Sequence, residues 1–134
     1  MDMRYQGSCH CGAVKFEADV DLTTASRCNC SICTKTAVTG AIGKPDALTV
    51  LAGEDVVAVY EWGHKVSQRY FCPRCGIHCY ARGHLAELGG DYISINVNCL
   101  DGVELAALSV VHWDGRHNNW EGGPRATPWP VLAA

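Results

Sequence analysis

Alternating apolar and polar positions predict several short strands along this chain. The clearest alternation is "DYISINVNC" over residues 91–99, where Ile93, Ile95, Val97 and Cys99 share one face and short polar side chains occupy the other. A period of two residues is typical of a strand with one face buried in the core. We therefore expect a strand here, with Cys99 as a buried free thiol.

Other segments carry weaker strand signals, and only one suggests a helix. Residues 13–18 and 65–72 alternate in the same way, and residues 56–62 are rich in β-forming side chains. Residues 101–111, "DGVELAALSVV", predict a helix of about two turns. Clusters of glycine and proline separate these segments, as expected for turns. The pattern predicts one mostly β domain over residues 1–134.

Length and composition agree with a single ordinary globular domain. The chain has 134 residues, of which 48% are hydrophobic and 19% are charged, which suffices for one modest core. We place this core at about residues 7–120 and expect residues 121–134 to be loop-like. No apolar run approaches the ~20 residues that cross a bilayer, and the first residues lack the apolar stretch of a secretory signal. We therefore expect a cytoplasmic protein with no membrane partner, of unknown oligomeric state.

The net charge argues against nucleic acid as a partner. The formal charge is −3 at pH 7, and the chain has no run of lysine or arginine. Nucleic-acid binding needs a basic face, and metal-bound thiolates would make this chain more negative still. A small basic group, comprising Arg69, Arg74 and Arg82, is explained about as well by the solvated face of a strand.

The cysteines are the most unusual feature of the composition. Seven of the nine fall into a C-x-C pair, a C-x-C-x2-C triplet and a C-x2-C pair, which comprise Cys9, Cys11, Cys28, Cys30, Cys33, Cys72 and Cys75. The other two, Cys79 and Cys99, stand alone. The count is odd and no export signal is visible, so disulfides are disfavoured. Clustered cysteines in a reducing compartment indicate metal ligands instead.

The C-x2-C pair has the chemistry of a zinc knuckle. In "CPRCGI", over residues 72–77, a tight turn lets both sulfurs reach one metal, and Gly76 can adopt the backbone angles that the turn needs. We expect the second pair of ligands from Cys9 and Cys11, because residues i and i+2 of a strand point the same way. Spacing alone leaves other groupings open: Cys9, Cys11, Cys28 and Cys30 in one site with Cys33, Cys72 and Cys75 in the other, and His78 as a further ligand.

The three clusters, in this order, resemble those of a known family. The segments that carry the likeness are "GSCHCGAVKFEA", "CNCSICTK", "FCPRCGIH", "GGDYISINVNCLDG" and "DGRHNNW", which extend from about Gly7 to Trp120. They resemble the glutathione-dependent formaldehyde-activating enzyme family, also called the Gfa or centromere-protein-V domain. The resemblance implies a β-tent fold, a single mostly β domain of several short, curved antiparallel sheets pinned by zinc.

The resemblance also implies two zinc ions per chain with different roles. Three protein ligands leave one tetrahedral position for water or substrate, as in catalytic zinc, whereas four close a structural site. Carried over to this chain, the structural ligands are Cys9, Cys11, Cys72 and Cys75, and the catalytic ligands are Cys28, Cys30 and Cys33. The implied reaction joins a small thiol such as glutathione to an aldehyde, formaldehyde. Its reverse breaks a carbon–sulfur bond, so the implied class is a carbon–sulfur lyase.

Two functions from different classes therefore remain at this stage. One is a zinc-dependent carbon–sulfur lyase acting on thiol–aldehyde adducts, and the other is a non-catalytic zinc module that binds protein or nucleic acid, as the centromeric relatives suggest. The negative net charge and the three-cysteine cluster favour the lyase. Arg27, Lys35 and Arg74 are the candidates for binding the carboxylates of glutathione, and His112, Trp113 and residues 117–120 are candidates for the edge of a pocket.

Overall fold

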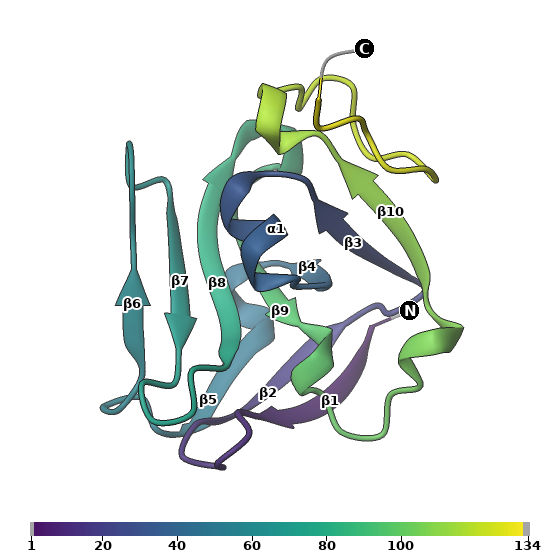
Figure 1. Cartoon of the computed structure of the whole chain (residues 1–134). Coiled ribbons are helices and arrows are strands. Elements are labelled where there is room, and N and C mark those ends of the chain that lie inside the picture. Colours follow the sequence, from purple (N-terminus) through teal and green to yellow (C-terminus); the bar gives the residue numbers. More distant parts are fainter. Residues whose placement is uncertain (1, 133–134) are drawn as a thin grey trace.

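The protein consists of two open β-sheets, as described for residues 2–132 by a computed structural model (Figure 1). The smaller sheet is antiparallel with strand order β1-β2-β5. Its strands are β1 (Met3–Ser8), β2 (Lys15–Val20) and β5 (Leu48–Ala52). The expected mostly β fold is confirmed, and its short strands pair antiparallel with one exception in the larger sheet.

The larger sheet has seven strands in the order β10-β3-β4-β9-β8-β7-β6. They are β3 (Thr24–Cys28), β4 (Gly40–Gly43), β6 (Ala58–Tyr60), β7 (Ser67–Phe71), β8 (His78–Leu85), β9 (Gly90–Asn96) and β10 (Ser109–Trp113). Its pairs are antiparallel except β10 and β3, which are parallel. The described chain has one α-helix, α1 (Ser31–Thr36), which directly follows β3. Short 3-10 helices lie at Pro45–Ala47, Ala86–Leu88, Val97–Cys99, Leu105–Ala107 and Gly115–His117.

The hydrophobic core lies between the two sheets. Phe16 on β2 is fully buried and meets Tyr80 on β8 edge to face, with ring centroids 5.7 Å apart. Ile93 and Ile95 on β9 are also fully buried, as their alternation predicts. Residues on the opposite face of β9, such as Ser94, are therefore turned away from this core. That second face carries the pocket described below.

The strand prediction for residues 91–99 is largely right, but the strand ends early. β9 stops at Asn96, and Val97–Cys99 forms a 3-10 helix. The side chain of Asn96 accepts a hydrogen bond from the backbone N–H of Asn98 at 3.1 Å, which turns the chain out of the sheet. Cys99 is buried, as expected, and its thiol donates to the His78 carbonyl at 3.5 Å.

The helix predicted over residues 101–111 is wrong. Gly102 has a φ of +70°, and the segment then forms only the short 3-10 helix at Leu105–Ala107 before it enters β10. The β-branched residues Val110 and Val111 pair with Ala25 and Ser26 of β3. Pairing with the sheet therefore outweighs the weak helical preference of this segment.

The C-terminal segment, expected to be loop-like, is held against the larger sheet. In the described part, residues 121–132 contain no strand, but the backbones of Arg125 and His112 exchange hydrogen bonds of 2.8 and 3.0 Å. The indole of Trp129 also donates to the His112 carbonyl at 2.9 Å, so this loop is docked on β10.

Among residues 2–132, no helix is long and apolar enough to span a bilayer.

Candidate metal centres and the adjoining pocket

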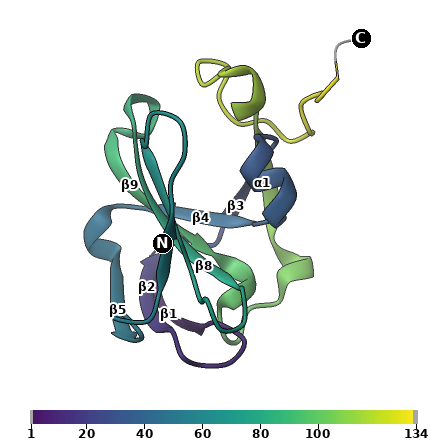
Figure 2. The same cartoon turned by 60° about the vertical axis from the view of Figure 1, so that its left-hand side comes forward.

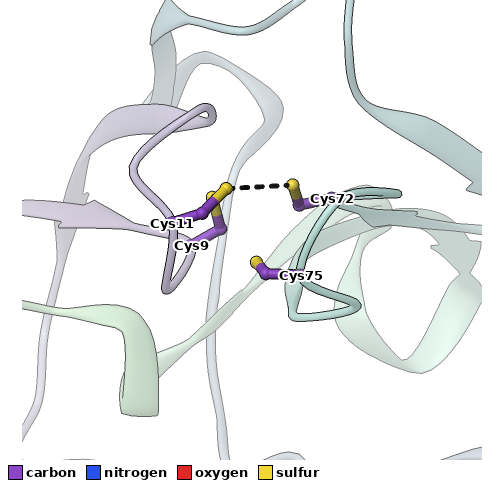
Figure 3. Close-up of side chains that lie close together, drawn as sticks. All are labelled: Cys9, Cys11, Cys72 and Cys75. Carbon is purple, nitrogen blue, oxygen red and sulfur yellow. Dashed lines mark hydrogen bonds between the residues drawn. The ribbon is translucent and has the colours of Figure 1, made fainter.

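Four cysteine sulfurs converge where the two sheets meet (Figure 3). Cys9 and Cys11 lie in the turn that follows β1, and Cys72 and Cys75 lie in the turn between β7 and β8. All four sulfurs are within 4.8 Å of one another. The Sγ atoms of Cys9 and Cys11 are 3.7 Å apart, as are those of Cys11 and Cys72. We call this group the four-sulfur cluster.

The dimensions of the four-sulfur cluster fit a tetrahedral metal such as zinc. Zn–S bonds of ~2.3 Å give a tetrahedron whose sulfur–sulfur edges are about 3.8 Å, close to the two distances of 3.7 Å. A disulfide would instead need about 2.05 Å, and all nine cysteines are free. The donor set and its spacing therefore suit a closed, four-coordinate site.

Backbone amides also favour the thiolate form in this cluster. The N–H groups of Cys11 and Ile77 bond to the sulfur of Cys75 and lower its pKa to about 6. The N–H of Val14 donates to the Cys9 sulfur at 3.3 Å. Since metal ligands must be deprotonated, such donors make these sulfurs better ligands.

The sulfurs of Cys9 and Cys11 converge, but the expectation that these residues share one face of a strand is wrong. β1 ends at Ser8, so Cys9 and Cys11 do not sit on a strand. Gly12, with a φ of +82°, instead closes a tight turn in which its N–H bonds to the Cys9 carbonyl at 3.3 Å. The first pair is thus a second knuckle, facing the turn in which Gly76 has a φ of +79°.

The remaining triplet forms a separate group, which we call the three-sulfur cluster. Cys28 ends β3, Cys30 is the N-cap of α1, and Cys33 lies within the helix. Their sulfurs are within 4.8 Å of one another, and no fourth cysteine, histidine or carboxylate of the described chain joins them. His78 belongs to neither group, and its ring stacks on Phe71. The alternative groupings that the spacing left open are not those adopted by the sulfurs.

The three thiols of the three-sulfur cluster differ in their pKa values. Hydrogen bonds from Cys28 and Cys33 lower the pKa of Cys30 to about 2, and the positive charge of Arg69 acts in the same direction. The same sulfur–sulfur hydrogen bonds raise the pKa of Cys33. The pKa of Cys28 is raised as well, so these hydrogen bonds favour one thiolate, on Cys30, beside two protonated thiols.

The segment after β10 braces the loop that carries Cys28 and Cys30. Asp114 is buried and accepts a hydrogen bond from the Asn29 side chain at 2.8 Å. The backbone N–H and the Nε of Arg116 each donate to Asn29, both at 2.9 Å. Burial acts to raise the pKa of Asp114, but hydrogen bonds from Asn29, His117 and Asn119 outweigh it and lower that pKa. Asn29 is thus fixed between two cysteines of the cluster.

A pocket of about 380 Å³ opens beside the three-sulfur cluster. Figure 2 shows α1 and the segment after β10 on one side of the molecule and the β8–β9 hairpin on the other, and residues from all of these elements line the pocket. Besides the three cysteines, its most prominent lining residues are Trp62, Arg69, Tyr92, Trp113 and Trp120. Burial raises the pKa of the Tyr92 hydroxyl, so that group stays protonated at neutral pH.

Arg69 is the pocket residue that sequence reasoning missed. The sequence placed it in a small basic group that a solvated strand face explained about as well, but it is half-buried on β7 and lines the pocket. Its Nη2 donates to the Cys33 sulfur at 3.6 Å, and its guanidinium lies 5.7 Å from the centre of the Trp62 ring. The only signal in the sequence was the alternation of residues 65–72, which does not tell which face is covered.

The other residues singled out in the sequence have mixed placements. Arg27 lines the pocket at an exposed position, whereas Lys35 and Arg74 are exposed and are not among its lining residues. Trp113 and Trp120 do edge the pocket, and His112 does not. Cys79 is fully buried in the core, and its thiol donates to the Ile77 carbonyl at 3.6 Å.

Comparisons with known proteins agree with this architecture. Residues 4–114 match the family described as "Glutathione-dependent formaldehyde-activating enzyme". A Halomonas elongata protein named "Putative glutathione-dependent formaldehyde-activating enzyme" is 37% identical over 83 residues, which cover 54% of this chain and 52% of that protein. The match thus spans about half the length of this relative. A solved Rhodobacter sphaeroides protein superposes with a TM-score of 0.69 at 29% identity, covering 75% of this chain and 92% of that one.

Proposed function

This chain belongs to the glutathione-dependent formaldehyde-activating enzyme family, and from that premise we propose that it is a carbon–sulfur lyase for thiol–aldehyde adducts. The reaction to test first is the one that the family name supplies, between glutathione and formaldehyde. The observation that supports it most is the three-sulfur cluster, which faces a pocket of about 380 Å³ and has no fourth protein ligand among the described residues.

The two clusters take different roles in this proposal. Cys9, Cys11, Cys72 and Cys75 hold a structural zinc, and Cys28, Cys30 and Cys33 hold a catalytic one. A zinc ion on three thiolates is a weak Lewis acid, and the chemistry it supplies is to keep an incoming thiol deprotonated, because a free thiol with a pKa of about 8.5 carries little charge at neutral pH. Arg69 partly offsets the negative charge of the three cysteines.

The reaction itself needs no redox partner. The thiol gives up its proton, its sulfur bonds to the carbonyl carbon of formaldehyde, and the carbonyl oxygen takes a proton to become the hydroxyl of an S-hydroxymethyl thioether. The reverse breaks the same carbon–sulfur bond. The chain's contribution is to hold the thiol in the pocket beside the cysteines and to exclude water from it, so that the two reactants meet in one orientation.

Nuclear magnetic resonance exchange spectroscopy tests this function directly. Formaldehyde labelled with carbon-13 is mixed with glutathione, and the exchange rate between hydrated formaldehyde and the adduct is measured with and without zinc-loaded protein. We expect faster exchange with the wild type and the uncatalysed rate with Cys33→Ser. Lys35→Ala, on the same helix but outside the pocket, is the matched control and should keep the wild-type rate.

Two results would overturn the proposal. One is an exchange rate that the protein leaves unchanged for every thiol tried, although the metal is present at both clusters; this would favour a non-catalytic zinc module. The other is full acceleration by Cys33→Ser, which would separate the reaction from the three-sulfur cluster.

A further inference from the structure

The lining of the pocket indicates which kind of thiol it accepts. We propose that the pocket takes a small thiol with an apolar, preferably aromatic, body and a single carboxylate, which Arg69 binds, in preference to glutathione. The thiol part of this inference rests on the proposed function. The binding of an aromatic carboxylate rests on the pocket alone.

The first observation is the apolar wall. Three tryptophans line the pocket, Trp62 from the loop between β6 and β7, and Trp113 and Trp120 from the end of β10 and the segment after it. Leu85 and Leu88 add aliphatic surface from the β8–β9 connection. Aromatic rings gain most from offset or edge-to-face contact with other rings. Such a wall favours a ligand that presents a ring or an alkyl group rather than a chain of peptide groups.

The second observation is an arginine with unused hydrogen-bonding capacity. The Nε of Arg69 is buried and has no hydrogen-bond partner in the described structure. A buried donor without a partner is costly. A guanidinium presents its N–H groups in a fork that matches a carboxylate. A carboxylate in the pocket would therefore meet a guanidinium whose one side-chain hydrogen bond in the described structure goes to the Cys33 sulfur.

The third observation is the absence of carboxylate side chains from the pocket. No aspartate or glutamate lies among the described residues that line the pocket. Glutathione carries two carboxylates and an ammonium group, and an ammonium that enters an apolar site without an acidic partner loses its hydration uncompensated. Arg27 is a second cation, but it is exposed at the rim. A ligand with one carboxylate for Arg69 and no ammonium group therefore suits a lining without acidic side chains.

A ligand without a thiol tests the pocket independently of the reaction. Binding of 3-phenylpropanoate to the zinc-loaded protein is measured by isothermal titration calorimetry and by the fluorescence of the pocket tryptophans. The uncharged 3-phenylpropanamide has the same ring and should bind about tenfold or more weakly, since it lacks the negative charge and the second acceptor oxygen of a bidentate pair with arginine. Equal binding of the acid and the amide would overturn the role of Arg69.

Matched variants locate the two contacts. Arg69→Met should weaken 3-phenylpropanoate binding about tenfold or more and leave 3-phenylpropanamide little changed, and Arg69→Lys should restore only part of the loss. Arg82→Met, on the neighbouring strand and outside the pocket lining, is the control. Trp62→Ala should weaken both ligands, whereas Val59→Ala, at an exposed position of β6 outside the pocket lining, should not. Zinc content is measured for each variant, and unchanged binding in Arg69→Met with two zinc ions present contradicts the proposal.

A panel of thiols then connects the pocket to the reaction. In the exchange experiment, the protein should accelerate the exchange of formaldehyde with 2-mercapto-3-phenylpropanoate more than its exchange with three other thiols. These are glutathione, 3-mercaptopropanoate (no ring) and 2-phenylethanethiol (no carboxylate). If 3-phenylpropanoate does not bind and glutathione is accelerated most, this inference fails while the proposed function stands. If 3-phenylpropanoate binds through Arg69 and no thiol is accelerated, the pocket assignment holds and the lyase function fails.

Discussion

The most crowded point beside the three-sulfur cluster is a glycine. A Cβ atom built on Gly115 would lie 2.5 Å from the sulfur of Cys28 and 2.7 Å from the ring of Trp120. A Cβ atom does not come this close to a non-bonded heavy atom, so any side chain at this position would have to displace the sulfur or the indole. Gly115 therefore lets the backbone pass between a metal-ligand candidate and a wall of the pocket.

The variant Gly115→Ala follows from this close approach. We expect it to displace Cys28 and to weaken zinc binding at the three-sulfur cluster about tenfold or more, while the four-sulfur cluster and the fold are retained. Gly43→Ala is the control, because a Cβ at Gly43 meets its neighbours at ordinary distances of 3.4–3.6 Å. Zinc affinity is measured by competition with a chromophoric chelator. Equal affinities for the two variants would show that the crowding has no consequence for the metal.

At the scale of elements, the segment after β10 acts as a brace for the cysteine loop. β10 and β3 are parallel neighbours, with Trp113 opposite Cys28. The residues that follow the two strands therefore leave the sheet side by side, at the carboxyl ends of the strands. There Asp114 holds Asn29 at 2.8 Å and His117 at 2.7 Å. This explains why a motif some 80 residues further along the chain contributes to the geometry of the triplet.

Loss of the Asp114 carboxylate should loosen this loop. Asp114→Ala leaves the Asn29 amide without its acceptor, and we expect zinc affinity at the three-sulfur cluster to fall about 10–100-fold, as for other groups that orient metal ligands. Asp91→Ala is a matched control, because Asp91 also accepts from a histidine, His84, at 2.7 Å, but at an exposed position. Chelator competition compares the two variants. A loss of the same size in Asp91→Ala would contradict a specific bracing role.

The elements also show what the alternation of the sequence can and cannot predict. Ile93 and Ile95 were assigned to the core face of their strand and are fully buried, because period two follows from the pleat itself. The polar face was correctly identified, but a pattern along one strand does not say what lies opposite it. That face carries the pocket, and for the same reason the alternation around Arg69 on β7 did not distinguish a solvated face from a pocket wall.

Short elements formed at the sites were harder to predict. The six residues of α1 cover less than two helical turns, too few for a helical period to emerge, and its sequence is dominated by the cysteine spacing. The knuckles were predictable, because Cys72 and Cys75 need only a local turn. Which pair joins them was not determined by spacing, since that depends on how the two sheets meet.

At the scale of the whole molecule, the two clusters differ in what they connect. The four-sulfur cluster joins the smaller sheet to the larger one, through residues as distant in sequence as Cys11 and Cys72. The three-sulfur cluster lies within a single loop and the start of α1. Closing a long loop restrains the unfolded chain much more than closing a short one. The two sites should therefore contribute very differently to stability.

This difference predicts opposite outcomes for two serine variants. In Cys75→Ser the link between the sheets loses a thiolate. Structural zinc in small motifs supplies roughly 10–16 kcal/mol of apparent binding free energy, whereas a whole domain is stable by only about 5–15 kcal/mol. Even partial loss should therefore unfold or aggregate the protein. In Cys33→Ser the protein should stay folded, with its zinc content falling from about two ions toward one and its thiol–aldehyde exchange lost.

Three measurements on both variants decide this prediction: thermal melting, zinc by native mass spectrometry, and the exchange rate of the thiol–aldehyde adduct. Cys99→Ser is a control for cysteine loss as such, because Cys99 is buried but belongs to neither cluster. It should keep both metal ions, so any fall in its melting temperature reports packing alone. If Cys33→Ser melts as early as Cys75→Ser, or Cys75→Ser keeps the wild-type melting temperature with one zinc fewer, the four-sulfur cluster is not what holds the two sheets together.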